Sequence, residues 1–252
     1  MSIRVRFGAM ELEGIVNIQT RRANKVAAVS IPRRHGALVP TVAFSEALYV
    51  SMAGEIWRDT PEAVRDYFDD LGAKLSNVGN DRLELIDDDR YVLALCVGTA
   101  FPQIDANRAP AQRAGFQIEF IAGDPFWYAS GESQNEQIAI ASSPHQWVIT
   151  NNGKIRTPVA VEVTAVGAPK TDVKVTNSTT GLFMRFTGTI AADSSVIFDS
   201  RRNRASVQNG GSNALNNFEG QFWALEIGDN NITYVGPTGV NVKTIWSARF
   251  IH

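Results

Sequence analysis

The sequence predicts a mainly β fold with one amphipathic helix, organised as an N-terminal domain over residues 1–129 and a C-terminal antiparallel β-sandwich over residues 130–252. Helical periodicity is convincing in a single segment, near residues 61–75. In mid-chain, residues 116–128 (FQIEFIAGDPFWY) form an alternating strand pattern that stops at Asp124-Pro125. Beyond residue 130, brief apolar runs alternate with polar turns, which is typical of a sandwich of short strands.

The composition is that of an ordinary globular protein of two domains. Hydrophobic residues make up 44% of the 252 residues and charged residues 20%, so neither disorder nor a fibrous repeat is expected. The formal net charge of −2 argues against specific nucleic-acid binding, which requires a basic surface. Cys96 is the only cysteine, which excludes an intrachain disulfide and indicates a small core residue.

The sequence also bears on where the protein folds. Its first residues, MSIRVRFGAM, lack the apolar stretch of a signal peptide, and nowhere are there roughly 18 consecutive apolar residues, as a membrane span requires. We therefore expect folding in a cytoplasm and no membrane partner.

Strand-like segments dominate the N-terminal domain. They cover residues 2–7, 15–19, 26–31, 39–44, 48–54, 82–86 and 90–97, followed by the strand that ends at Asp124. A basic turn, PRRHG at residues 32–36, follows the third segment, and an acidic turn at residues 87–89 precedes the segment that starts at Arg90.

The predicted helix begins after Thr60, which suits the N-cap position. Pro61 at the first helical position and Glu62 in the first turn agree with this start. The apolar side chains follow helical spacing and form one stripe that can lie on a sheet: Val64, Tyr67, Phe68, Leu71 and Leu75.

Two features of this helix are unfavourable. Gly72 lowers helix propensity by about 1 kcal/mol and suggests an early end. Asp69 and Asp70 then lie near the C-terminal end of the helix, where its dipole disfavours negative charge. We expect neighbouring Arg or Lys side chains to hold them, with a subunit interface as one source of such cations.

The C-terminal domain carries seven or more short strand candidates at spacings of about 8–12 residues. They are residues 159–163, 173–175, 182–186, 196–198, 222–227, 232–235 and 243–250. Turn residues that tolerate positive φ separate them, as in Asn151-Asn152-Gly153 and Thr180-Gly181. No repeat of constant period is visible, so a propeller or solenoid is not expected.

The order of these elements resembles the distal tail proteins (Dit) of long-tailed, siphovirus-type bacteriophages. The N-terminal part of the resemblance rests on the turn at 32–36, the helix, the Asp-Asp-Arg turn at 88–90 and the segment 116–128. The C-terminal part is similar to the galectin-like sandwich of that family, through residues 151–153, 173–177, 179–181, 228–230 and the closing WSARF at 246–250. The resemblance covers nearly the whole chain.

The resemblance implies a structural role in the virion tail tip, without enzymatic activity, cofactor or metal. In such families the N-terminal domain forms a homo-hexameric ring that joins the tail tube to the baseplate hub and leaves a channel for DNA. The implied partners are further copies of the chain, the tail tube protein and the baseplate hub or tail-associated protein, with assembly in the host cytoplasm.

Two groups of residues are candidates for subunit contacts. The aromatic residues Phe126, Trp127 and Tyr128 suit anchors at an interface, because such contacts favour aromatic side chains. Their alternative role is to fill the core where the two domains meet. Arg201, Arg202 and Arg204 form the densest basic cluster, which fits either a solvated loop or a site for a partner's carboxylates.

Motifs for catalysis are missing from the sequence. His35, His145 and His252 are far apart, and no HExxH, GxSxG, P-loop or GxGxxG motif occurs. His35 is expected in a turn or an interface and His145 in a solvated loop. Asp87, Asp88 and Asp89 lack the spread of ligands of an EF-hand and are expected to form an acidic hairpin turn.

A carbohydrate-binding module is the alternative function. Trp223 and Glu226 have the spacing of a galectin sugar site, but the His-x-Asn-Pro-Arg element of galectins is missing. Strand alternation moreover places Trp223, Leu225 and Ile227 on one face, which is expected to be the core. The sandwich is therefore expected to serve as a scaffold or docking domain.

Overall fold

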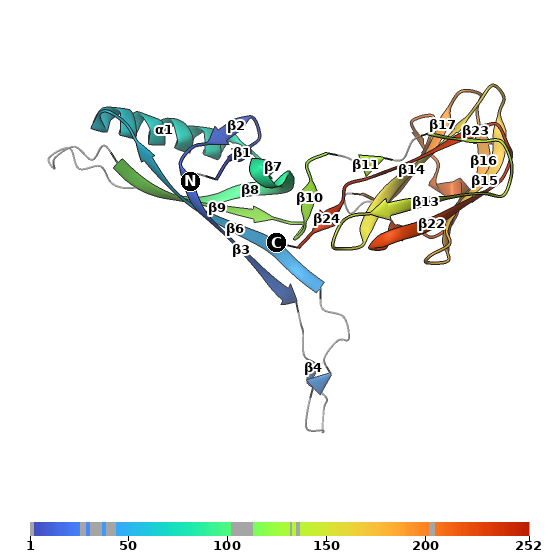
Figure 1. Ribbon diagram of the computed structural model, residues 1–252, viewed down its shortest axis with the longest axis horizontal. Coiled ribbons are helices and arrows are strands. Elements are labelled where there is room, and N and C mark those ends of the chain that lie inside the picture. The colour runs from blue at the N-terminus through green and yellow to red at the C-terminus, as the bar shows by residue number, and fades with distance from the viewer. Residues whose placement is uncertain are drawn as a thin grey trace. The chain divides into compact units, whose positions relative to one another are not determined.

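The computed structural model describes residues 3–25, 29–30, 37–38, 44–101, 113–131, 133–134, 137–201 and 205–251. The chain divides into two compact units, one ending at Trp127 and one spanning Tyr128–Ile251. Strands dominate both units, and the described residues contain a single α-helix (Figure 1). The predicted mainly β fold with one helix is confirmed.

The first unit is an antiparallel sheet with the helix on one face. Its strands follow the order β2-β1-β7-β8-β9-β6-β3. Their bounds are β1 Val5–Phe7, β2 Met10–Leu12, β3 Ile15–Lys25, β6 Phe44–Trp57, β7 Asp81–Leu85, β8 Arg90–Ala100 and β9 Arg113–Ala122. The short strands β4 (Val29–Ser30) and β5 (Ala37–Leu38) pair with each other. Strand β1 lies within the predicted segment 2–7, whereas β2 was missed because it has only three residues.

Helix α1 spans Pro61–Asn77, and its start is the one predicted. The Thr60 side-chain oxygen accepts a hydrogen bond from the Ala63 amide at 3.2 Å. The predicted early end at Gly72 is wrong, since the helix continues for another turn. A Cβ atom at Gly72 would lie 3.2 Å from the Phe101 ring, which stacks on Phe68 with centroids 5.0 Å apart. Gly72 thus makes room for an aromatic side chain rather than ending the helix.

Alternation along the strands places the core of the first unit between the sheet and α1. Phe68 of α1 makes an edge contact with Phe116 of β9 at 5.8 Å, and both rings are buried. Between β7 and β8 the predicted acidic turn is a 3-10 helix, η1, over Ile86–Asp88, and the Asp87 carboxylate accepts a hydrogen bond from the Arg4 amide. Cys96 is only half-buried, and β8 contains an irregularity between Cys96 and Gly98. Its predicted core position is therefore wrong.

The second unit is a sandwich of two antiparallel sheets, as predicted. One sheet follows β11-β23-β14-β17-β18-β19, with β12 against β23 and β21 against β14; the other follows β13-β22-β15-β16-β20. Their bounds are β11 Ser133–Gln134, β12 Ile138–Ile140, β13 His145–Asn151, β14 Thr157–Ala165, β15 Lys170–Asn177, β16 Leu182–Ile190, β17 Ser195–Asp199, β18 Ser206–Asn209, β19 Ser212–Asn213, β20 Phe218–Gly220, β21 Ala224–Leu225, β22 Gly228–Val235 and β23 Val240–Trp246. Buried side chains from both sheets form one core.

Three details of the second unit differ from the sequence prediction. His145 begins strand β13 opposite Tyr234 and is half-buried, so it does not lie in a solvated loop. Ile227 is 61% exposed, because β21 ends at Leu225 and the chain turns at Gly228, whose φ is 84°. The predicted strand 243–250 is divided into β23 and β24 (Arg249–Phe250).

Several predicted features lie outside the described residues. They are the basic turn at 32–36 with His35, most of the segments 26–31 and 39–44, Arg202, Arg204 and His252. Within the described ranges, no helix has the length and apolar character needed to cross a bilayer.

Candidate functional site

The aromatic block after β9 is held by a turn that its own sequence supplies. Asp124 accepts a hydrogen bond from the Phe126 amide at 3.2 Å, which fixes the chain around Pro125. Trp127 is fully buried, whereas Phe126 and Tyr128 are half-buried. Trp127 therefore fills the interior, and only Phe126 and Tyr128 present ring surface. Their role in subunit contacts stays a prediction.

Each of the two accessible rings lies beside an arginine. The Arg249 guanidinium carbon is 5.5 Å from the centroid of the Tyr128 ring, and that of Arg22 is 5.8 Å from the Phe126 ring. Two guanidinium nitrogens of Arg22 find no hydrogen-bond acceptor within the described part of the chain. Burial lowers the pKa of Arg22, while the charge of Asp124 opposes that shift. Arg22 is thus a partly desolvated cation whose two unpaired nitrogens are buried.

The predicted basic cluster is described only at Arg201. Its Nε and Nη2 donate to the two carboxylate oxygens of Asp199 at 3.1 and 3.0 Å. This fork-on-fork geometry orders the side chain and balances its charge within the chain. The assignment of Arg201 to a partner's carboxylates therefore also stays a prediction.

The side of the first sheet that faces away from α1 exposes apolar side chains, and we call it the outer sheet face. Tyr49 of β6 and Leu95 of β8 both pair with Ile121 of β9, which makes a continuous row across three strands. Tyr49 is 40% exposed and Leu95 41% exposed, and Trp57 on the same side of β6 is 70% exposed. Leu93 and Val97 of β8 are exposed as well. Apolar surface that gathers in this way typically marks a contact site.

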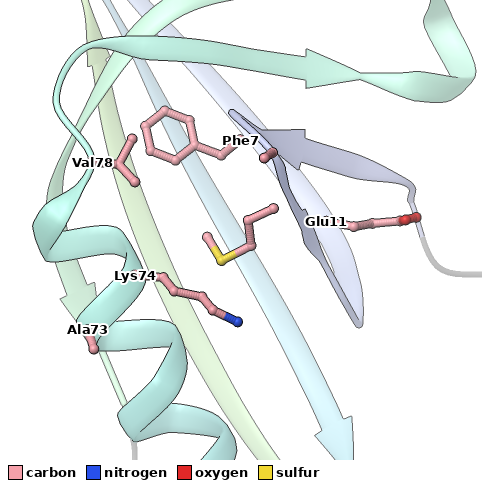
Figure 2. A pocket seen from close by; sticks show the side chains of 7 residues that line it. Phe7, Glu11, Ala73, Lys74 and Val78 are labelled. Atoms are coloured by element: carbon pink, nitrogen blue, oxygen red, sulfur yellow. The ribbon is translucent and has the colours of Figure 1, made fainter.

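A groove of about 680 Å³ lies between the end of α1 and the β1–β2 hairpin. Its lining consists of Phe7, Ala9, Met10, Glu11, Ala73, Lys74 and Val78. Figure 2 shows Lys74 extending from the helix toward the strands and Glu11 directed away from them. The Lys74 ammonium group also forms an ion pair with Asp70. The lining offers one amine and one carboxylate rather than a convergent polar set, so it does not resemble a catalytic or cofactor site.

Four buried polar side chains organise one end of the sandwich. Asn151 donates to the carbonyl oxygens of Ile155 and Leu225, and it accepts from the Gly153 amide and the Thr157 hydroxyl. Asn177 donates to the Ala224 carbonyl oxygen. Asn230 accepts a hydrogen bond from the Glu226 amide and donates to the Glu226 carbonyl oxygen, so these buried side chains together hold the backbone of residues 224–226. The motif-like positions around 151, 177 and 230 are therefore structural.

The geometry argues against a galectin-type sugar site. Trp223 is 1% exposed and donates from its ring nitrogen to the Val175 carbonyl oxygen at 3.4 Å. Glu226 is paired with Arg156, with 3.2 Å between carboxylate oxygen and Nε. A sugar ring requires an exposed aromatic face, which Trp223 does not offer. Trp223 was correctly expected in the core.

The described residues also contain no group of three or more His, Cys, Asp or Glu side chains that could hold a metal ion. Sequence reasoning missed the buried, unpaired nitrogens of Arg22 and the outer sheet face. Tyr49, Leu93 and Leu95 had a usable signal, because β6 and β8 carry apolar residues on both faces. Such a pattern indicates a strand covered on both sides.

The chain is similar to known phage proteins in both sequence and fold. Residues 152–250 match the family model of the siphovirus-type tail component, C-terminal domain. No curated protein matches the chain. Among solved structures, the Dit protein of phage SPP1 matches over 100% of both chains, with a TM-score of 0.74 at 13% identity. The phage P2 baseplate matches in its activated conformation with Ca (TM-score 0.46, 12% identity) and with Sr (0.45, 11%), each over 98% of this chain and 92% of that one.

Residues 152–250 thus resemble the C-terminal domain of siphovirus-type tail components. The whole chain has the fold of the Dit protein of phage SPP1, and the resemblance to distal tail proteins expected from the sequence is confirmed.

Proposed function

We propose that the chain assembles as a homo-hexameric ring that joins the tail tube to the baseplate hub and leaves a central channel for DNA. The observation that carries this proposal is the likeness to the SPP1 Dit protein over the full length of both chains. That protein is described as a paradigm of the hub adsorption apparatus in phages that infect Gram-positive bacteria.

The surface of the first unit supports a role in assembly. Tyr49, Leu93, Leu95 and Val97 expose apolar area that the described part of the chain does not cover. Subunits of a closed ring contact each other through two different patches, so each must keep such surfaces free when monomeric. The outer sheet face is such a free surface. It can form one of the two contacts between neighbouring subunits, or it can bind a partner protein above or below the ring.

The two parts of the chain take different roles in this proposal. Residues 1–129 form the ring, and the galectin-like sandwich at 130–252 serves as a docking domain. Phe126 and Tyr128, with the arginines at 201, 202 and 204, contribute to contacts with neighbouring proteins. The partners are other copies of the chain, the tail tube protein and the hub protein. The ring is assembled in the host cytoplasm and becomes part of the virion tail tip. Its role is structural and involves no catalysis.

Native mass spectrometry of the purified chain tests the stoichiometry. The expected species has six times the mass of the 27.5 kDa chain. If the chain is monomeric at high concentration, the tail tube and hub proteins are added and the measurement is repeated. A chain that stays monomeric with both partners present would contradict the proposal.

A further inference from the structure

Strand β13 forms one edge of the five-stranded sheet in the second unit. It pairs with β22 along all seven residues, His145–Asn151, and the register is unbroken. No other strand in the described part of the chain pairs with it. Alternate residues of an edge strand direct their N–H and C=O groups away from the sheet. β13 therefore keeps a row of backbone donors and acceptors available to another strand.

β13 also lacks the features that usually protect an exposed edge. Its sequence, HQWVITN, contains no Lys, Arg, Asp, Glu or Pro. The long edge strand of the first unit, β3, carries Arg21 and Arg22 and has two irregularities in its pairing with β6. Other edge strands, such as β2, β12 and β20, have only three residues each. An uncharged, regular edge strand of seven residues is a template for strand pairing.

The side chains of β13 match those of a second copy of the same strand. In an antiparallel pair centred on Val148, the two Val148 side chains lie opposite each other. Gln146 then lies opposite Thr150 on the outer face of the sheet, where both are exposed. Trp147 lies opposite Ile149 on the face that packs against the core. Polar residues thus meet polar ones, apolar residues meet apolar ones, and no like charges are brought together.

Two apolar side chains of β13 keep accessible surface that this partner would cover. Val148 is 56% exposed. Trp147 packs against the core but is only half-buried, whereas Ile149 on the same face is 2% exposed. A second copy of β13 would place its own Ile149 side chain beside the Trp147 ring and its own Val148 beside Val148. The pairing therefore buries apolar surface in addition to satisfying backbone groups.

We propose that β13 pairs with β13 of a second copy of this chain, antiparallel and about a two-fold axis at Val148. The pairing joins the two five-stranded sheets into one continuous sheet. A two-fold contact uses the same surface on both copies, so it differs from the head-to-tail contact of the proposed ring and does not rest on it. It links the second units of two rings or of two free chains.

The size of the contact indicates how strong it is. One seven-residue strand per copy offers less area than the roughly 1,200 Å² at the lower limit of stable interfaces. The pairing is therefore weak and reversible, and it leaves the stoichiometry of the ring unchanged. Covalent trapping is the appropriate way to detect such a contact.

Disulfide trapping tests the pairing in the full-length protein, with Cys96→Ser as the background so that each introduced thiol is the only one. Directly opposite residues of an antiparallel pair have Cα atoms about 4.5–5.5 Å apart, which is within disulfide range. Under mild copper–phenanthroline oxidation, Val148→Cys is expected to form a covalent dimer about tenfold faster than Val235→Cys. Val235 is the matched control, since it is 45% exposed on the same sheet face, in the neighbouring strand β22.

Two further variants test the direction of the strands. Gln146→Cys and Thr150→Cys lie opposite each other in the proposed register, but each is distant from its own copy. Neither alone is expected to cross-link faster than the control, whereas their equimolar mixture is expected to form the mixed dimer, identified by its mass. Rapid cross-linking of Gln146→Cys alone would indicate parallel strands and overturn the register. Circular dichroism verifies folding, and the mixture carries the test if Val148→Cys does not fold.

The outcomes separate this contact from the ring. If the chain forms six-fold species and Val148→Cys cross-links no faster than Val235→Cys, the strand pairing is overturned and the ring proposal stands. If the chain forms no ring even with its tube and hub partners but Val148→Cys cross-links rapidly, the ring proposal fails and the strand pairing stands.

Discussion

The side-chain amide of Asn177 donates a hydrogen bond to the side-chain oxygen of Asn230 at 3.2 Å, and both residues are fully buried. Asn230 in turn donates to the carbonyl oxygens of Glu226 and Gly228 and accepts from the Glu226 amide. The Asn230 side chain thus provides hydrogen-bond partners both for the Asn177 side chain and for the backbone of the turn after β21.

Asn230→Ala is expected to lower the free energy of unfolding by about 2–4 kcal/mol, because it leaves several buried polar groups without partners. Urea denaturation measures this loss. Asn231→Ala is the matched control, since the adjacent residue is exposed, and should change stability by less than about 0.5 kcal/mol. Equal effects of the two substitutions would show that the buried network does not stabilise the sandwich.

Gly54→Ala is expected to destabilise the first unit by about 1–3 kcal/mol through overpacking. A Cβ atom at this position would collide with the ring of Phe116, which is buried against Phe68. Gly115→Ala on the neighbouring strand provides the control, because the closest atom is the Gly54 carbonyl oxygen at 3.7 Å. Thermal unfolding compares the two variants, and a Gly54→Ala protein as stable as Gly115→Ala would contradict this packing.

These contacts show what the sequence could and could not reveal. The start of α1 was predictable because Thr60, Pro61 and Glu62 act locally. The end of α1 was not, because the space at Gly72 is filled by Phe101, which is distant in sequence. The exposure of Ile227 likewise depends on two hydrogen bonds between the Asn230 side chain and the Glu226 backbone, which shorten the strand. The alternation of apolar and polar residues predicts which side chains share a face of a strand. It does not predict where polar contacts with distant residues end the strand.

The candidate surfaces were predictable only in part. Trp223 was correctly expected in the core, since it belongs to an alternating apolar segment, and Trp127 takes the interior position that the sequence left open as the alternative to a contact role. The proximity of Arg22 to Asp124 and Phe126 depends on the return of the chain from β3 to β9 across the sheet. The periodicity of apolar residues in one sequence does not predict which strands become neighbours, so this proximity could not be expected.

The ion pair between Asp172 and Arg185 predicts a pH-dependent stability. Arg185 donates to both Asp172 oxygens at 2.6 and 2.9 Å, and these hydrogen bonds lower the pKa of the Asp172 carboxyl below 3.8. A carboxyl with a lowered folded-state pKa stabilises the protein above its unfolded pKa, and the contribution disappears as pH falls through the folded pKa. The pair is solvent-exposed, so the contribution is small.

Asp172→Asn is therefore expected to lower the melting temperature slightly at pH 7, by a difference from the wild type that shrinks as the pH falls toward 2. Asn tolerates the backbone φ of 58° at this position, so the substitution isolates the charge. High salt should shrink the difference at pH 7. A melting-temperature difference that is equal at both pH values would mean that the ionised pair is not its cause.

Glu62, Asp66 and Asp70 lie four residues apart on the exposed side of α1, and this like-charge spacing is expected to lower the stability of the helix. Asp66→Lys replaces two like-charge contacts, with Glu62 and Asp70, by opposite-charge contacts four residues apart. It is expected to raise the free energy of unfolding by about 0.5–1 kcal/mol at low salt. Arg65→Glu on the same helix should act in the opposite direction, since it adds a fifth carboxylate. Melting temperatures in low and high salt test both, and destabilisation by Asp66→Lys would contradict the charge assignment.

Electron microscopy of the assembled particle tests the central claim most directly. The purified chain, alone or with the tail tube and hub proteins, is imaged and classified without imposed symmetry. The account predicts end-on views of a six-fold ring with an open centre. Closed two-fold dimers, open filaments or monomers under all of these conditions would contradict it.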